Sequence, residues 1–251
     1  MKSNQQKLSF STPKIIMMVA LFIFISGCSS IDVEKVRALD KVAVPMITIG
    51  KYIDMGQFSL GSVVQRLAED EKFDLNPALE SLYDKTYNDF ETSLPFSIID
   101  EDEMIGSEAY KNFNPFSKPK NKVYKPSYLL TPDGYMKYHP VALNKKKRAK
   151  VLNVIPDEAD AAMFVYITYD LVKRQVPMLP VSNAAIRANI NLDIYDRQGE
   201  RILKIRKRAE SEEDMKAVAG VLSNTEKIRS MTLSATEKAL KAADDYINDN
   251  L

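Results

Sequence analysis

The stretch Ala185-Ile-Arg-Ala-Asn-Ile-Asn-Leu-Asp-Ile-Tyr195 alternates between apolar and polar side chains over most of its length. Successive residues of a β-strand point to opposite faces, so the alternation predicts a strand with one buried and one solvated face. Such strands are typical of antiparallel sheets. The apolar positions are Ile186, Ile190, Leu192 and Ile194, with Ala188 as a small member, and the polar ones are Arg187, Asn189, Asn191 and Asp193.

The flanking segments predict two further strands. Ala161–Val172 is the strongest strand pattern of the chain, and Arg201–Arg206 follows the quoted stretch after the tight turn Asp196-Arg-Gln-Gly199. We expect the three strands to form an antiparallel meander.

Towards the amino terminus, Lys41–Ile49 is rich in β-branched residues and predicts another strand. Pro45 lacks a backbone donor, which favours an edge position or a bulge. Gly50–Gly61 is interpreted as an ordinary loop, because its glycine spacing matches neither a P-loop nor a dinucleotide fingerprint.

Helices are predicted between and after these strands. Leu75–Phe90 has apolar residues at helical spacing and the start signal Asn76-Pro77. A short strand is expected within Pro95–Ile99. The acidic run Asp100–Glu103 lacks the spacing of a calcium loop, so we interpret it as the first turn of a helix over Glu101–Tyr110.

The last quarter of the chain predicts one long helix. Glu212–Ser223 is expected to be helix or loop, and the final helix starts at Asn224 or Thr225. Its many alanines predict close approach to a sheet. The expected buried face is Ile228, Met231, Ala235, Ala239, Ala242 and Tyr246.

Residues 112–156 read as an irregular insertion rich in Pro, Tyr and Lys. Dense proline excludes a long helix or a central strand over 112–140, and Leu143–Ile155 can form a basic helix. The insertion either packs onto the core through its tyrosines or offers a binding face. That candidate face is Lys145, Lys146, Lys147, Arg148, Lys150, Tyr124, Tyr128 and Tyr135.

Together these elements predict an α/β fold: a mixed, largely antiparallel sheet with helices packed over one of its faces. We expect residues 41–251 to form a single domain that contains the insertion.

The charge of the chain is balanced overall but uneven along its length. It has 35 basic and 34 acidic residues, which gives no general reason to expect nucleic acid as a partner. Residues 54–103 hold 13 acidic and 3 basic residues, whereas 115–150 hold 10 basic and one acidic. These segments either attract one another or provide a basic face for an anionic lipid, a glycan or an acidic partner.

Residues 1–27 have the layout of a secretory signal: lysines, an apolar run over Ile15–Ile25 and small residues before Cys28. The run has 11 residues, too few to cross a bilayer. Ile25-Ser-Gly-Cys28 resembles the lipobox of bacterial lipoproteins, and Cys28 is the only cysteine. The alternative is an ordinary signal with an incidental cysteine.

The lipobox resemblance implies cleavage before Cys28, a diacylglycerol on its thiol and a further acyl chain on the new amine. Ser29, where an Asp would retain such a protein at the inner membrane, implies the outer membrane. Residues 28–40 are short and polar, and we expect them to be a lipidated tether.

The chain also resembles a group of envelope proteins. The resemblance rests on Lys41-Val-Ala-Val, Asp160-Ala-Ala-Met-Phe-Val-Tyr, Leu192-Asp-Ile-Tyr-Asp-Arg-Gln-Gly199 and the alanine-rich final helix. The group includes the curli-secretion lipoprotein, lipoprotein activators of penicillin-binding proteins and the amino-terminal domain of TolB, and it implies an anticodon-binding-domain-like fold. The insertion and the short link at 173–183, too small for the membrane hairpins of a secretion pore, depart from it.

Three functions follow as hypotheses. The first is a non-enzymatic accessory or assembly protein at the periplasmic face of the outer membrane, anchored through Cys28 and bound to an envelope protein. The second is a lipid- or glycan-binding or transfer module. The third is an envelope hydrolase, for which no nucleophile elbow occurs and His139 stands alone. No cofactor or metal is expected.

Overall fold

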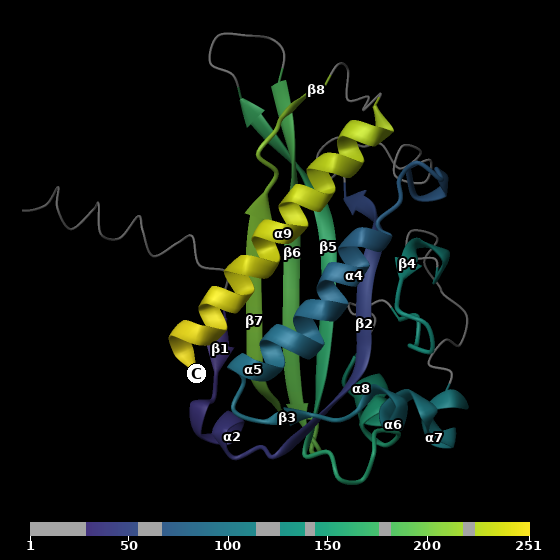
Figure 1. The fold of residues 1–251 in the computed structure, drawn as a ribbon, viewed down its shortest axis with the longest axis vertical. Coiled ribbons are helices and arrows are strands. Elements are labelled where there is room, and N and C mark those ends of the chain that lie inside the picture. Colours follow the sequence, from purple (N-terminus) through teal and green to yellow (C-terminus); the bar gives the residue numbers. More distant parts are fainter. Residues whose placement is uncertain (1–28, 55–66, 114–125, 139–143, 176–181, 218–223) are drawn as a thin grey trace, which may run out of the picture.

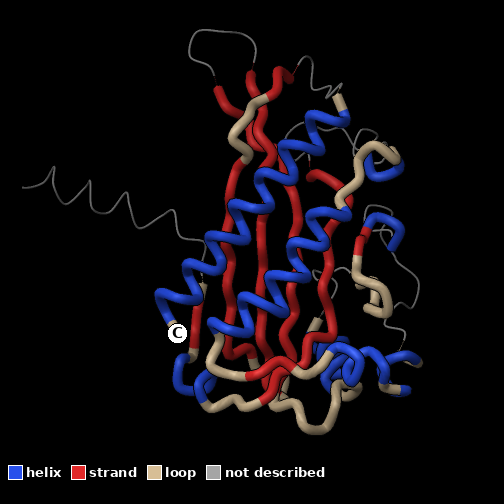
Figure 2. Tube along the Cα trace, viewed as in Figure 1, coloured by secondary structure: helices blue, strands red, loops and turns tan. Residues whose placement is uncertain are grey.

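The computed structural model describes residues 29–54, 67–113, 126–138, 144–175, 182–217 and 224–251. Its centre is an open sheet of eight strands, six of them in the order β1-β7-β6-β5-β2-β3, with β4 on β2 and β8 on β6. Helices lie against this sheet (Figures 1 and 2). The predicted fold class, mixed α/β with a largely antiparallel sheet, is confirmed.

The predicted meander is the middle of the sheet. It consists of β5 (Ala161–Gln175), β6 (Ser182–Asp196) and β7 (Arg201–Glu210), and both pairings are antiparallel. The strands extend beyond the predicted bounds. Gly199 in the β6–β7 turn has φ of 78°, a conformation that glycine adopts without strain.

The amino-terminal strand β2 (Lys41–Asp54) lies parallel to β5. The pairing is irregular between Ala43 and Met46, which places Pro45 in the bulge that its missing donor favours. The strand runs five residues past Ile49, so the first part of the predicted loop Gly50–Gly61 is strand instead. Residues 55–61 lie outside the described ranges. Short strands β3 (Ser97–Ile98) and β4 (Leu129–Leu130) pair with β2.

The segment expected to be a tether is part of the fold from Ser29 on. Strand β1 (Ser30–Ile31) pairs with β7, and helix α2 (Val33–Arg37) follows, capped by the Asp32 carboxylate. Val36 is fully buried in the main core. The prediction was wrong because one buried valine leaves no periodic signal in a polar segment.

One face of the sheet is covered by two long helical segments side by side (Figure 1). The first is continuous from α4 (Asn76–Asp84) through the π-helical turn η2 (Lys85–Phe90) to α5 (Glu91–Ser93), and the second is α9 (Thr225–Asn250). Both confirm predicted helices. The buried face of α9 turns slightly from the expected one, since Ala243 and Ile247 are buried while Ala242 and Tyr246 are partly exposed.

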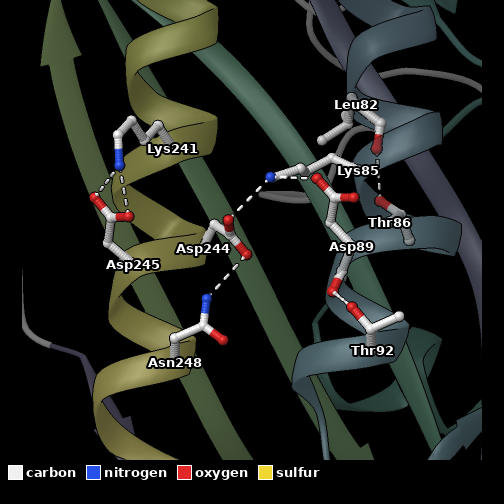
Figure 3. Close-up of polar contacts among 9 residues, drawn as sticks. All are labelled: Leu82, Lys85, Thr86, Asp89, Thr92, Lys241, Asp244, Asp245 and Asn248. Atoms are coloured by element: carbon white, nitrogen blue, oxygen red, sulfur yellow. Dashed lines mark hydrogen bonds and ion pairs between the residues drawn. The ribbon is translucent and has the colours of Figure 1, made fainter.

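Figure 3 shows how these two segments are joined. The Lys85 ammonium contacts the carboxylates of Asp89, one turn on, and Asp244 of α9, the latter at 3.0 Å. Burial lowers the pKa of Lys85, but the hydrogen bonds to the two carboxylates outweigh it and raise the pKa above 10.5. The Asp244 carboxylate also accepts a hydrogen bond from Asn248.

Helices also pack on the second face, which corrects the expectation that they cover one face only. They are α6 (Glu101–Gly106), α7 (Glu108–Lys111) and α8 (Lys145–Leu152). With Met46 and Phe164 of the sheet they enclose a smaller core at one end of it. The predicted helix 101–110 breaks at Ser107, whose hydroxyl caps α7, and its acidic first turn is confirmed. The stretch 212–223 contains β8 (Met215–Ala217) rather than only helix or loop.

Candidate binding faces

The exposed lysines of α8 form the first candidate, here called the lysine face: Lys145, Lys146 and Lys150. The other two predicted members, Lys147 and Arg148, are half-buried against aromatic rings. The Lys147 ammonium lies 5.4 Å from the ring centre of Tyr138, and the Arg148 guanidinium lies 4.4 Å from that of Tyr195. These contacts hold the helix and leave the lysine face outward.

The carboxyl end of α8 is held by Arg197 from the β6–β7 turn. Its guanidinium donates to the carbonyls of Leu152 at 3.2 Å, Ala159 at 2.7 Å and Pro156. At the other end the Asn144 side chain accepts from the amide of Lys147. The first turn contains lysines and no acid, an arrangement that the helix dipole disfavours. Helix stability therefore does not explain these charges.

The described tyrosines of the predicted face belong to the core instead. Tyr128 and Tyr135 are 4% and 5% exposed. The Tyr128 hydroxyl donates to Glu69 at 3.3 Å, and the Tyr135 hydroxyl is 2.5 Å from that of Tyr87. The alternative interpretation, in which tyrosines pack the insertion onto the core, holds for both because each fills apolar space. Tyr124, Cys28 and His139 lie outside the described residues.

The second candidate is the part of the second sheet face that none of the described helices covers, here called the sheet face. It is built of polar residues in register across β5, β6 and β7, and it adjoins a cavity of about 410 Å³. Its rows are Lys204–Asp193, Arg206–Asn191–Tyr166, Arg208–Asn189–Thr168 and Glu210–Arg187–Asp170.

Most charged side chains of the sheet face are held in ion pairs. Asp170 binds Arg187 and accepts from Asn189 at 2.5 Å. Asp193 is 5% exposed and is contacted by Arg206, and by Arg201 at 3.8 Å. Its oxygen towards Arg201 has no hydrogen bond.

Two cations of this face have no ion-pair partner within the part of the chain that the structure describes: Lys204 and Arg208. Between them the Arg206 guanidinium lies 5.7 Å from the ring centre of Tyr166. Burial raises the pKa of Tyr166 to about 12, so its hydroxyl remains a neutral donor at neutral pH. The face can therefore donate hydrogen bonds and attract anions.

A third hollow, of about 530 Å³, lies beside α4 and α6 and is lined mainly by acidic and apolar residues. The Tyr83 hydroxyl donates to Glu101 there. Burial is the larger cause and the hydrogen bond to Glu101 the smaller one, and together they raise the pKa of Tyr83 to about 12. No group of three His, Cys, Asp or Glu that could hold a metal occurs in the described ranges.

Sequence reasoning singled out the lysines of α8 as a candidate face but did not point to the sheet face. The signal was present, because Arg187, Asn189 and Asn191 alternate along the quoted strand. We interpreted them as solvated, and only the pairing with β7 shows that they adjoin a row of cations.

A comparison of the chain with protein-family models finds no match, and a comparison with curated proteins finds none either. Within the described ranges, none of the helices combines the length and the apolar character needed to cross a membrane.

Proposed function

We propose that this protein is a lipid-anchored envelope lipoprotein that acts as a non-enzymatic accessory or assembly protein at the periplasmic face of the outer membrane. The observation that carries the proposal is Ile25-Ser-Gly-Cys28, which follows a basic and then an apolar segment and contains the only cysteine. Small residues before a thiol give a peptidase access and supply the acceptor for a lipid. Several acyl chains anchor a protein far more firmly than one.

The proposed partner is another envelope protein, bound through the lysine face. Three features support this role: the exposure of Lys145, Lys146 and Lys150, the rigid support from Arg197, and first-turn cations that helix stability does not explain. A rigid cationic helix fits an acidic protein surface, because charge complementarity steers encounter and fixes register.

Anchoring is tested by intact-mass analysis of the protein purified from envelopes. We expect cleavage before Cys28 and an acylated residue 28, with Cys28→Ala neither acylated nor retained in the outer membrane. Ser30→Ala is the matched control, because Ser30 lies just beyond the lipobox, and it should be processed normally. An unmodified Cys28 in the membrane-bound protein would refute the anchor.

Partner binding is tested by crosslinking in envelopes followed by pull-down. Wild type should capture one defined envelope protein, and Lys145→Glu/Lys146→Glu should lose it. The control Lys204→Glu/Arg208→Glu changes charge by the same amount on the sheet face and should retain the partner. Capture of the same protein by both variants, or by neither, contradicts the proposed contact.

A second candidate function, lipid or glycan binding, is supported by the sheet face. Its cavity is lined by Tyr166, Asn189 and Asn191, and such mixed aromatic and amide surfaces suit polar ligands. Lipid or glycan that co-purifies with wild type, and is lost in Asn189→Ala, would favour this function over the first.

A further inference from the structure

We propose that Lys204, Arg206 and Arg208 of β7, here called the cationic stripe, dock onto anionic lipid headgroups of the membrane that holds the protein. This inference rests on the proposed anchoring at Cys28, because the anchor decides which surface the stripe meets. It concerns the sheet face, not the lysine face to which the protein partner was assigned.

The stripe is continuous because its members alternate along one strand. Leu203 and Ile205 point into the main core, so the residues between and after them point to the opposite face, which none of the described helices covers there. Alternate residues of a strand are roughly 7 Å apart. The three cations therefore stand in a line along one side of the sheet face.

The stripe carries more positive charge than its surroundings neutralise. Arg201 and Arg206 share the carboxylate of Asp193. Lys204 and Arg208 make no ion pair with any residue that the structure describes. The ion pair with the buried Asp193 holds Arg206 in place, so this member of the stripe is ordered before it meets a ligand.

The stripe also lies next to the anchor point. The backbone amide of Arg206 donates to the Ser29 hydroxyl at 3.2 Å, and Ser30 pairs directly with Lys204. Ser29 is the residue after Cys28, so lipid on Cys28 would place the bilayer surface beside β7. Polybasic segments close to a membrane anchor bind anionic headgroups and strengthen attachment.

A simpler role for these cations is protection of an edge. Only the start of β7 is covered by β1, and charged side chains on an edge strand prevent pairing with other chains. That role needs no anionic surface and predicts no preference among lipids. The two explanations therefore differ in a measurable property.

The test is sedimentation with vesicles, using the chain from residue 28 with Cys28→Ser, which contains every described element. It should bind vesicles of phosphatidylglycerol and phosphatidylethanolamine, but not vesicles of phosphatidylcholine, and binding should fall with added salt. Lys204→Thr/Arg208→Thr should weaken binding about 25-fold, because each cation near an anionic surface contributes a factor of about five.

Matched variants make the result specific. Lys145→Ser/Lys146→Ser removes two cations from the lysine face and should change binding by less than about twofold if that face is turned away from the lipid. Lys204→Arg/Arg208→Lys keeps the charges and should bind like wild type, and circular dichroism checks that every variant is folded. Equal losses in the two charge-removing variants, or no preference for anionic vesicles, overturn the inference.

The vesicle test can fail without the anchoring test failing, so the two results can be told apart. An acylated Cys28 in the full chain combined with no preference for anionic vesicles overturns this inference alone. An unmodified Cys28 overturns the anchored arrangement and the proposed function together.

Discussion

The hydroxyl of Tyr110 joins two segments that are far apart in the chain. It donates to the carbonyl of Pro45 at 2.6 Å and accepts from the amide of Met136 at 3.0 Å. Pro45 lies in the β2 bulge, where the sheet pairing is interrupted. Tyr110 is 3% exposed, and burial raises the pKa of its hydroxyl, so the group stays neutral and can both donate and accept.

We therefore expect Tyr110→Phe to lower the free energy of unfolding by about 2 kcal/mol, since a buried carbonyl and a half-buried amide lose their partner. Urea denaturation measures this. Tyr246→Phe is the control: its ring lies 3.6 Å from the Lys207 ammonium, and its hydroxyl makes no hydrogen bond to a described residue. A loss no larger than that of the control would show that solvent replaces the Tyr110 contacts.

Lys85 supports a second prediction at this scale. The side chains of Lys85 and Asp244 are 20% and 22% exposed, so removal of the ammonium leaves a half-buried carboxylate without its cation. We expect Lys85→Met to cost about 1–2 kcal/mol of unfolding free energy. Lys241→Met, from an exposed pair with Asp245, should cost less than about 0.5 kcal/mol.

The pH dependence of the Lys85 contribution has a definite sign. The pKa in the folded protein is raised above the ordinary 10.5, so the folded state holds this proton more tightly than the unfolded state. The contribution is complete below pH 10.5 and is lost as the pH rises through the raised value. From neutral pH upwards, the stability difference between wild type and Lys85→Met should therefore shrink only in strongly alkaline solution, as urea titrations across that range would show.

At the scale of elements, α2 and β1 belong to the fold and not to a linker. Val36→Ala should lower the free energy of unfolding by about 2 kcal/mol, because it leaves a cavity in the main core. Glu34→Ala changes an exposed residue of the same helix and should be nearly neutral. Equal stability of the two variants would restore the tether interpretation.

Helix α9 gives a second prediction at this scale. Ala235, Ala239 and Ala243 are fully buried, and their small side chains let the helix approach the sheet closely. Ala239→Leu should cost about 1–3 kcal/mol through overpacking, whereas Ala242→Leu, at a partly exposed site, should have little effect. Thermal unfolding compares the two, and a larger loss for Ala242→Leu would support the face expected from the sequence.

The long helices and strands could be predicted because each repeats its spacing of apolar residues over several helical turns or several pairs of strand residues. This holds for β5, β6 and the helices from Asn76 and Thr225. Strands of two or three residues, such as β1, β4 and β8, give no such repeat and exist only because a neighbouring strand offers hydrogen bonds. The sequence of α9 predicts a helix but not which of its faces is buried, because alanine is compatible with both buried and exposed positions.

At the scale of the whole molecule, the two faces of the sheet are unequal. The α4–α5 segment and α9 cover one face, whereas α6, α7 and α8 cover only one end of the other (Figure 1). The parallel pairing of β2 with β5 joins residues more than a hundred positions apart, and no local pattern specifies it. The sequence therefore predicts the fold class and the alternating polar residues of β6, but not their position beside the cations of β7.

The pairing of β1 with β7 also sets an order of events during synthesis. Ser29 and Arg206 are separated by 177 positions, so the first strand has no partner until most of the chain has been made. Closing so long a loop is slow. If Cys28 is cut and lipidated as proposed, the enzymes would therefore meet residues 29–31 without their β7 partner early and paired with it later. On the proposed processing at Cys28, maturation of the amino terminus would have a time window that closes when β1 joins the sheet.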